Sequence, residues 1–366
     1  MEHTESVMAA MSTAMTQAAP AWRCWVITDG TKGMEVQSCG LAEAMDLATR
    51  RILLEPPALL RHCPRLGRIP VIDRLLLPAM ISEIAEQHGW PDLLIATGRR
   101  MAGLSIAIRS VARSAGAGTR TIQIQDPRLP AQLFDRLVIP SHDRLRAENI
   151  LLSTGSLGQP QRKISSTTDI ASAQPSQADT QQQTAITALP RPRILVLIGG
   201  SNRRYAVVAA DINRLAERLA DIAERCSASL IILPSRRSPP QTAAILAEHL
   251  TGQSAYIWDQ DQNHTNPYPL VLQDADAIIV TSDSVNMTSE ACSTGKPVFT
   301  YAIRQETGRI GRFHAQMQQA GHSRMLPDSA SPANIFASPA AAPLDETRRI
   351  ASLLLEWLES SGEKTG

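Results

Sequence analysis

The stretch that most constrains the fold of this chain is the one between Ala277 and Tyr301. It opens with a short apolar run, 277–280, which has the length and composition of a buried strand. The polar residues 281–284 follow and supply N-cap side chains for a helix. We expect that helix at about 285–292, ending at a Gly-Lys-Pro turn that leads into a second apolar strand. The stretch therefore predicts one β–α–β unit of a parallel sheet.

The start of this expected helix is a candidate anion site, because its first N–H groups have no partner inside the helix and its dipole is positive there. Ser284 is the expected N-cap, and Met287 and Thr288 follow in the first turn. Glu290 lies one to two turns into the helix, where it is placed to accept hydrogen bonds from hydroxyls such as those of a ribose. An ordinary capped helix with a solvated Glu290 gives the same signals, so both interpretations stay open.

Strand and helix signals alternate in two series, which predicts an α/β fold with mostly parallel sheets covered by helices. Between the series, the chain is rich in Ser, Thr, Gln and Ala without hydrophobic periodicity, as in a flexible linker. We expect a disordered tail at 1–21, one domain at 22–152, the linker at 153–190, a second domain at 191–340, and a terminal amphipathic helix and tail at 341–366 that packs on either half.

Composition narrows the functional classes. The 366 residues suffice for two domains, and no run approaches the ~20 apolar residues of a membrane span. A net charge of +1 and 4% aromatic residues disfavour nucleic-acid binding. The five cysteines lack metal-type spacing, and residues 1–21 lack the basic and apolar regions of a secretory signal, which indicates a reducing, cytoplasmic location.

Ligands of open parallel sheets bind beyond the carboxyl ends of the strands, and the conspicuous residues of this chain follow expected strands. A Gly199-Gly200 turn comes after one such strand and allows the backbone to approach a ligand closely. Arginine forks suit phosphates and carboxylates, although a surface doublet is the alternative for any one pair. Three pairs occupy equivalent positions and together predict a diphosphate site: Arg99-Arg100, Arg203-Arg204 and Arg236-Arg237.

Other signatures are absent from the sequence. No Gly-x-Gly-x-x-Gly follows the first expected strand, and there is no P-loop, no Gly-x-Ser-x-Gly elbow and no zinc motif. The eight histidines are isolated. His142, beside Asp143 at a strand end, and His314 are the two that merit testing, although a lone histidine is more often structural.

Five segments in this order resemble the bacterial relatives of the plant elongated-mitochondria fission protein. The resemblance spans about 22–325 and is carried by Ile27-Thr-Asp-Gly-Thr-Lys-Gly33, Pro91-Asp-Leu-Leu-Ile-Ala-Thr-Gly-Arg-Arg100, Gln123-Ile-Gln-Asp-Pro-Arg128, Ile198-Gly-Gly-Ser-Asn-Arg-Arg-Tyr205 and Thr281-Ser-Asp-Ser-Val-Asn-Met-Thr-Ser-Glu290. That family is similar in turn to GT-B glycosyltransferases and to nucleoside-diphosphate-sugar epimerases. The resemblance therefore implies two Rossmann-like domains facing across a cleft.

The resemblance also implies roles for particular residues. The second domain is expected to hold a nucleotide-diphosphate sugar, with a glutamate at the place of Glu290 on the ribose, and the first domain is expected to receive the acceptor. No metal or cofactor is expected. The candidate nucleotide side comprises Gly199, Gly200, Ser201, Asn202, Arg203, Arg204, Ser235, Arg236, Arg237, Ser284, Met287, Thr288 and Glu290. The candidate acceptor side comprises Lys32, Thr97, Gly98, Arg99, Asp126 and His142.

One departure from the transferases concerns the general base. Those that make cell-wall lipid precursors carry a histidine after the first strand, whereas this loop holds Asp29 and Lys32. Asp29 is the candidate base here, since a positioned carboxylate can take a proton from an acceptor hydroxyl. Its alternative role is to cap a turn.

These observations favour a GT-B-like glycosyltransferase that acts on an envelope-related acceptor. The alternatives are a nucleoside-diphosphate-sugar epimerase and a non-catalytic adaptor like the plant fission proteins, since a fold does not guarantee catalysis. Residues 58–77 mix Leu and Ile with Arg61, Arg65, Arg68 and Arg74, as in an interfacial membrane segment at the inner face of the membrane. Helices packed in the core have the same pattern and are the alternative.

Overall fold

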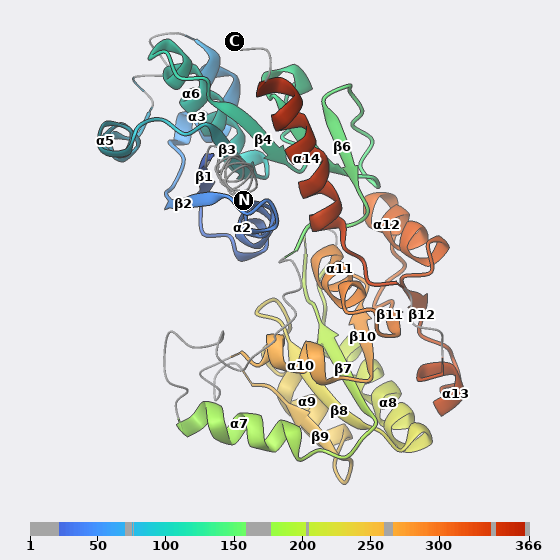
Figure 1. The fold of residues 1–366 in the computed structure, drawn as a ribbon. Coiled ribbons are helices and arrows are strands. Elements are labelled where there is room, and N and C mark those ends of the chain that lie inside the picture. The colour runs from blue at the N-terminus through green and yellow to red at the C-terminus, as the bar shows by residue number, and fades with distance from the viewer. Residues whose placement is uncertain are drawn as a thin grey trace, which may run out of the picture. The chain divides into compact units, whose positions relative to one another are not determined.

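The computed structural model describes residues 22–69, 75, 77–158, 177–202, 205–259, 266–337 and 342–362. The chain forms two compact units. Unit 1 is made of the described residues within Met1–Val138, Ala147–Leu151 and Leu355–Gly366, and unit 2 of those within Ile139–Arg146 and Leu152–Leu354. A six-stranded sheet forms the centre of each unit (Figure 1).

The sheet of unit 1 has the strand order β2-β1-β3-β4-β5-β6. Its elements in chain order are β1 (Arg23–Thr28), α2 (Lys32–Ala44), β2 (Ala48–Leu53), α3 (Ala58–His62), the 3-10 helix η1 (Pro64–Arg68), α5 (Ala79–His88), β3 (Leu93–Thr97), α6 (Arg99–Ser114), β4 (Arg120–Ile124), the 3-10 helix η2 (Ala131–Leu133), β5 (Arg136–Pro140) and β6 (Ile150–Ser153). The pairs β1–β2, β1–β3, β3–β4 and β4–β5 are parallel.

Helix α6 is largely buried within unit 1. Its residues from Met101 to Ile108 are all buried, because the sheet covers one side of the helix and the α3–η1 segment packs on it as well. The backbones meet there at two glycines. A Cβ on Gly103 would lie 2.6 Å from the Leu60 carbonyl oxygen, and one on Gly67 would lie 2.6 Å from the Gly103 carbonyl oxygen. Contact this close fixes α3 and η1 against α6.

Unit 2 has the strand order β12-β11-β10-β7-β8-β9, and its described strand pairs are parallel. Its elements are α7 (Gln177–Thr187), β7 (Arg193–Ile198), α8 (Ala209–Cys226), β8 (Ser229–Pro234), α9 (Thr242–His249), β9 (Ala255–Ile257), α10 (Tyr268–Asp274), β10 (Ala277–Thr281), α11 (Val285–Ser293), β11 (Val298–Tyr301), α12 (Gly308–Gln319), β12 (Arg324–Met325) and α13 (Pro332–Ile335). The last helix of the chain is α14 (Glu346–Gly362).

Alternating residues of the strands of unit 2 enter two apolar clusters, one on each face of the sheet. Ile194 and Val196 of β7 pack in one cluster with residues of α8 and α9. Leu195 and Leu197 pack in the other cluster with residues of α10, α11 and α12. Burial on both faces explains why β7 reads as a continuous apolar run in the sequence.

The strand orders define where a ligand fits each unit. In unit 2 the chain runs outward from β7 to β8 and β9 and then returns to add β10 on the other side of β7, so the order reverses between β7 and β10. In unit 1 the reversal lies between β1 and β3. Open α/β sheets bind ligands at the carboxyl ends of the two strands that flank such a point.

The expected β/α alternation and the α/β class are confirmed. The sequence analysis did not predict the helices α7, α10, α12 and α13, the 3-10 helix η2, or the strands β6 and β12. The polar segment at 153–190 contains α7, whose Ile186 is fully buried. Ile186 is the one buried side chain among residues 179–187, so the segment has no periodic apolar pattern.

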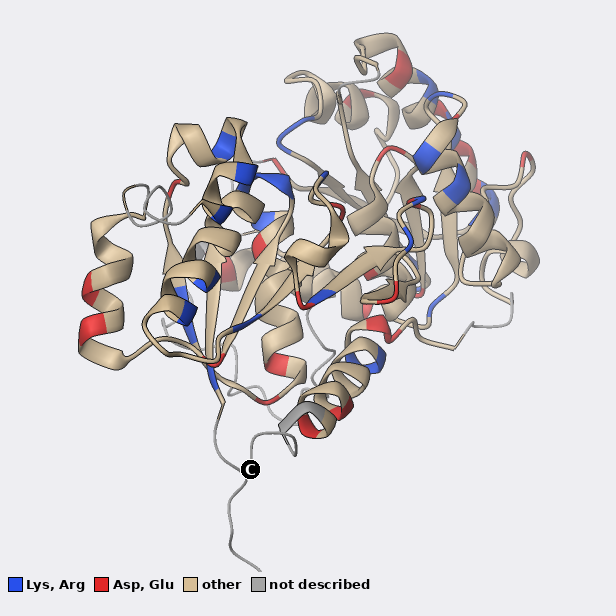
Figure 2. Cartoon of the chain, turned by 90° about the horizontal axis from the view of Figure 1, so that it is seen from above, with Lys and Arg blue, Asp and Glu red and all other residues tan. Residues whose placement is uncertain are grey.

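Charge is distributed in both signs over the two units. Figure 2 shows Lys and Arg interspersed with Asp and Glu along the ribbon, in keeping with the net charge of +1. Among the described residues, the helices include none with the length and hydropathy needed to cross a bilayer.

Replacement of Gly103 by alanine tests the contact between α3–η1 and α6. We expect Gly103→Ala to lower the free energy of unfolding by about 1–3 kcal/mol, as other overpacked contacts do, because the new Cβ meets backbone atoms that have no room to move. Gly118→Ala is the matched control, since nothing lies within 4 Å of its Cβ position. Urea denaturation followed by circular dichroism measures both. Equal stability of the two variants would contradict the close contact.

Candidate functional site

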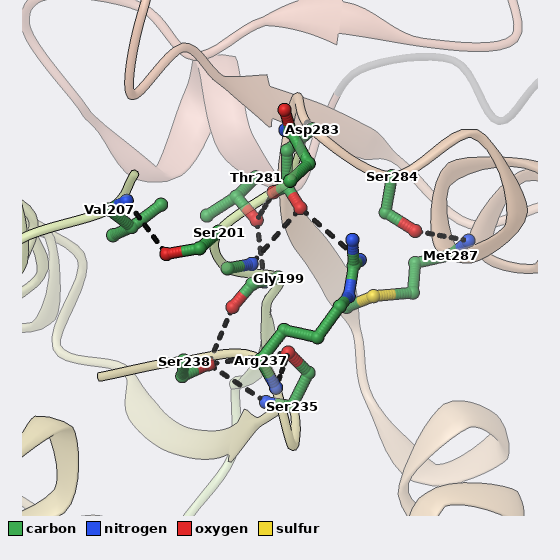
Figure 3. A network of polar contacts seen from close by, with 12 residues as sticks. Gly199, Ser201, Val207, Ser235, Arg237, Ser238, Thr281, Asp283, Ser284 and Met287 are labelled. Atoms are coloured by element: carbon green, nitrogen blue, oxygen red, sulfur yellow. Dashed lines mark hydrogen bonds and ion pairs between the residues drawn. The ribbon is translucent and has the colours of Figure 1, made fainter. Parts of the chain in front are cut away.

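The Gly199-Gly200 turn lies directly after β7 and is tied to the loops that follow β8 and β10. The Gly199 N–H donates to the Thr281 hydroxyl at 2.7 Å, and the Ser201 N–H donates to the Arg237 carbonyl at 3.0 Å. A Cβ on Gly200 would lie 2.0 Å from that carbonyl oxygen, and one on Gly199 would lie 2.1 Å from the Asp283 carboxylate. Only glycine fits at both positions. These contacts bring the segments that follow β7, β8 and β10 together at one turn (Figure 3).

Asp283 is the buried centre of this network. Its carboxylate accepts hydrogen bonds from the Gly200 N–H at 3.0 Å and from the Thr281 hydroxyl at 2.7 Å. The Arg237 guanidinium forms an ion pair with it at 3.4 Å (Figure 3). Burial raises the pKa of the Asp283 carboxyl, against the effect of these partners. Asp283 therefore connects the loops after β7, β8 and β10 instead of facing a ligand.

Helix α8 follows β7 and helix α11 follows β10, and of these two helices α11 leaves its first turn open to an anion. Asp211 occupies the start of α8, where it accepts from the Val208 N–H at 3.0 Å and pairs with Arg304. At α11 the start is neutral, because Ser284 caps the Met287 N–H at 3.3 Å and no acidic residue lies in the first turn. The positive end of the α11 dipole is thus available to a ligand.

The loop after β8 brings arginine to the same edge. Ser235 and Ser238 hold this loop to the end of β7, since the Ser238 hydroxyl donates to the Gly199 carbonyl at 2.5 Å. Arg237 reaches from the loop to Asp283, and Arg236 is exposed with no ion pair among the described residues. Arg203 and Arg204 lie outside the described residues.

Glu290 lies farther along α11, about 7 Å along the axis from Val285 at the usual helical rise. One of its carboxylate oxygens accepts a hydrogen bond from the Tyr268 hydroxyl at 2.5 Å. Burial raises the pKa of the Glu290 carboxyl. This bond holds the side chain in one orientation while its second oxygen remains available as an acceptor.

Four other residues of the predicted nucleotide side lie near the Gly199-Gly200 turn or in the first turn of α11. Ser201 accepts from the Val207 N–H at 3.0 Å, and Asn202 accepts from the Tyr205 N–H at 3.3 Å. Met287 is partly buried in the first turn of α11. Thr288 is fully buried, and its hydroxyl donates to the Ser284 carbonyl at 3.0 Å, so its side chain supports the helix start from inside.

Unit 1 has a second polar cluster at its own reversal point. Asp29 accepts from the Thr31 N–H at 3.0 Å, which is the bond of a turn, and it also pairs with Arg100 at 3.1 Å. Arg99 is exposed at the start of α6, and Lys32 is exposed at the start of α2. The Asp29–Arg100 ion pair thus joins the loop after β1 to the start of α6, which follows β3, the neighbour of β1 in the sheet.

Three more acceptor-side predictions are placed as follows. Thr97 is buried, with its hydroxyl 2.5 Å from that of Ser38, and Gly98 follows it with a φ of 81°. Asp126 accepts from the Arg128 N–H at 2.8 Å in the loop after β4. Thr97 and Asp126 therefore support the loops that carry the exposed residues.

His142 belongs to unit 2, where it is 1% exposed. Its ring contacts Phe313 edge-on, with the centroids 5.3 Å apart, and neither ring nitrogen has a partner among the described residues. Burial, followed by the nearby charges of Arg309 and Arg312, lowers the pKa of His142 to about 4. His314 is also buried, and its Nε2 lies 2.7 Å from the Ser282 carbonyl oxygen.

The sequence did not identify three residues of this arrangement. Thr281 and Asp283 stand within the quoted motif, yet their role depends on hydrogen bonds to a loop 80 residues away in the chain. Tyr268 lies at the start of α10, a helix that was not predicted. No local signal marks it. Among the described residues, no group of three or more His, Cys, Asp or Glu side chains is placed to hold a metal.

The architecture defines a class of protein. Two Rossmann-like units of this kind form a GT-B-like fold, and solved structures with the same fold include two bacterial proteins. One is a putative UDP-N-acetylglucosamine 2-epimerase from Listeria monocytogenes, with a TM-score of 0.57 and 13% identity over 94% of this chain and 97% of that one. The other is the S. aureus MnaA–UDP co-structure, with a TM-score of 0.53 and 11% identity over 92% and 97%.

The chain belongs to the mitochondrial fission ELM1 family, whose model matches residues 32–358. It is 28% identical to the mitochondrial fission protein ELM1 of Arabidopsis thaliana over 298 residues, which are 74% of this chain and 65% of the plant protein. The match thus spans less than two thirds of the plant relative. An uncharacterized protein of Rickettsia prowazekii (strain Madrid E) is 26% identical over 361 residues, 90% of this chain and 97% of that protein.

The buried His142 predicts a pH dependence of stability. Its pKa is lower in the folded chain, about 4, than the ordinary 6.5 of an unfolded one, so the unfolded state binds the proton more readily. The free energy of unfolding should therefore fall as the pH drops from about 6.5 to 4, by up to about 3 kcal/mol from this residue. His142→Phe should remove that part of the dependence.

Denaturation by urea at a series of pH values measures this effect. The exposed His62→Gln variant serves as control and should follow the wild type throughout. An unchanged slope in His142→Phe would show that the folded chain accommodates a charged ring at this position.

Proposed function

We propose that unit 2 binds a nucleoside-diphosphate sugar and that the protein transfers the sugar to an envelope-related acceptor bound by unit 1. The observation that carries this proposal is the convergence of the loops after β7, β8 and β10 at the reversal point, with the open start of α11 beside them. Nucleotide phosphates bind at such places in α/β sheets.

The arrangement along α11 fits the two ends of a nucleotide. The helix start and Arg236 are suited to the diphosphate, since the charge of Arg237 is already offset by Asp283. Glu290, about 7 Å farther along the helix, is suited to the ribose hydroxyls through the oxygen that Tyr268 leaves available. Arg203 and Arg204 add positive charge to the same turn in the sequence. The shared fold supplies further support, because MnaA of S. aureus was solved with UDP.

Transfer requires a base for the acceptor and stabilisation of the leaving group. The bond between the anomeric carbon and the diphosphate oxygen breaks, the acceptor oxygen bonds to that carbon, and the acceptor proton passes to a base. Asp29 is the candidate base, and the start of α11 with the arginines offsets the charge on the departing diphosphate. No metal is required for this step.

Binding of nucleotide sugars tests the proposal directly. We expect a UDP-sugar to bind with release of heat in isothermal titration. Arg236→Ala and Glu290→Gln should each weaken binding roughly 10- to 100-fold, because each removes a hydrogen bond that involves a charged group. Arg225→Ala is the control, since Arg225 pairs with Asp221 on the exposed side of α8.

The same measurement separates the alternatives. An adaptor without catalytic function predicts no binding of any nucleoside-diphosphate sugar, and that outcome would contradict the proposal. Epimerisation is the second candidate and is supported by one observation, namely that the putative UDP-N-acetylglucosamine 2-epimerase cited above shares the fold. Incubation with UDP-N-acetylglucosamine in the absence of an acceptor distinguishes the two, since only an epimerase converts the sugar to its 2-epimer under these conditions.

A further inference from the structure

Unit 1 exposes a series of apolar side chains in a short part of the chain. Among the described residues, five of the eight large hydrophobic side chains that are exposed lie between positions 53 and 80. These are Leu53 (55% exposed), Leu59 (47%), Ile69 (43%), Leu75 (82%) and Met80 (39%). A concentration of this kind marks an interaction surface.

The structure excludes the alternative that α3 and η1 are simply buried helices of the core. Leu60 and Gly67 face α6, and both are buried. Leu59, Arg65 and Arg68 are exposed on the same two short helices, and Ile69, which follows η1 directly, is exposed as well. Because the backbone contacts at Gly67 and Gly103 hold the inner side rigidly, the outer side is a fixed platform, which we call the α3–η1 surface. It comprises Leu59, His62, Arg65, Arg68 and Ile69.

The charge of the α3–η1 surface is of one sign. The sequence from Pro56 to Ile69 contains three arginines and no acidic residue. Arg65 and Arg68 are exposed, and neither has an acidic partner among the residues that the structure describes. Exposed apolar side chains interleaved with arginine complement an anionic phospholipid surface, in which the apolar groups enter the acyl boundary and the cations remain with the headgroups.

The position of Leu53 links this surface to the acceptor loop of unit 1. Leu53 ends β2, and its Cδ1 lies 3.2 Å from the position of a Cβ on Gly30. Gly30 follows Asp29 in the loop after β1. The exposed apolar series therefore begins beside the loop that carries the candidate base.

We propose that the α3–η1 surface docks the protein peripherally on anionic phospholipid bilayers. This binding does not require a nucleotide and is separate from the function proposed above for unit 2. Leu59 and Ile69 insert at the membrane interface, and Arg65 and Arg68 contact the lipid phosphates.

Co-sedimentation of the full chain with lipid vesicles tests the proposal. We expect binding to vesicles of phosphatidylcholine that contain phosphatidylglycerol, little binding to phosphatidylcholine alone, and release at high salt. Arg65→Ala combined with Arg68→Ala should lower the partition coefficient roughly 30-fold, since each cation near an anionic surface contributes about a factor of five. Leu59→Ser combined with Ile69→Ser should also weaken binding.

Matched controls lie in unit 2. Met325→Ser removes a side chain that is 50% exposed, and Arg144→Ala removes an exposed arginine, so neither should change vesicle binding. Circular dichroism and the unfolding midpoint show whether the α3–η1 variants remain folded. Nucleotide-sugar affinity measured without lipid should stay at the wild-type value in all of them, which distinguishes failure of this proposal from failure of the nucleotide proposal.

Several results would overturn the docking proposal. These are an absence of vesicle binding by the wild type, equal binding to neutral and anionic vesicles, or wild-type binding by folded α3–η1 variants. Self-association of the wild type in analytical ultracentrifugation would also overturn it if the Leu59→Ser with Ile69→Ser variant abolished that association. The α3–η1 surface would then be covered by a second copy of the chain.

Discussion

The buried carboxylate of Asp283 holds together the region of unit 2 on which the candidate site depends. A charge buried without partners is strongly destabilising, so the folded state must supply donors for it. Here they are the Gly200 N–H, the Thr281 hydroxyl and the Arg237 guanidinium, which come from the ends of three neighbouring strands. Each bond brings one loop to the same point. The hydrogen bonds and the ion pair of the Asp283 carboxylate therefore fix the positions of the three loops at this edge of the sheet.

This arrangement also determines which groups remain for a ligand. The charges of Asp283 and Arg237 offset one another, and Asp211 already occupies the start of α8. The groups left over are the first N–H groups of α11 and the exposed Arg236. At α8 the start of the helix is already occupied by the Asp211 carboxylate, which Arg304, 93 residues away in the chain, holds in place. The first turn of α11 contains no acidic residue.

The elements that sequence analysis predicted correctly are those whose signals are local. Apolar runs such as 193–198 and 277–281 are buried strands, and Ser284 caps α11 as expected. What it did not predict depends on contacts between distant segments: Tyr268 on Glu290, and the burial of His142 against Phe313. Residues 58–77 were ambiguous for the same reason. An amphipathic pattern is identical for a core helix and an interfacial one until the inner side is seen to pack on Gly103.

The two units use the same physical device at their reversal points, with different consequences. In each, an aspartate after a central strand pairs with an arginine from the segment after the neighbouring strand: Asp283 with Arg237 of a loop, and Asp29 with Arg100 in the first turn of α6. Asp283 has two further donors and is fully enclosed, so its role is structural. Among the residues that the structure describes, Asp29 has one further donor, the Thr31 N–H, and its arginine is half exposed. An acceptor that carries phosphate would compete with the Asp29 carboxylate for the half-exposed Arg100 guanidinium.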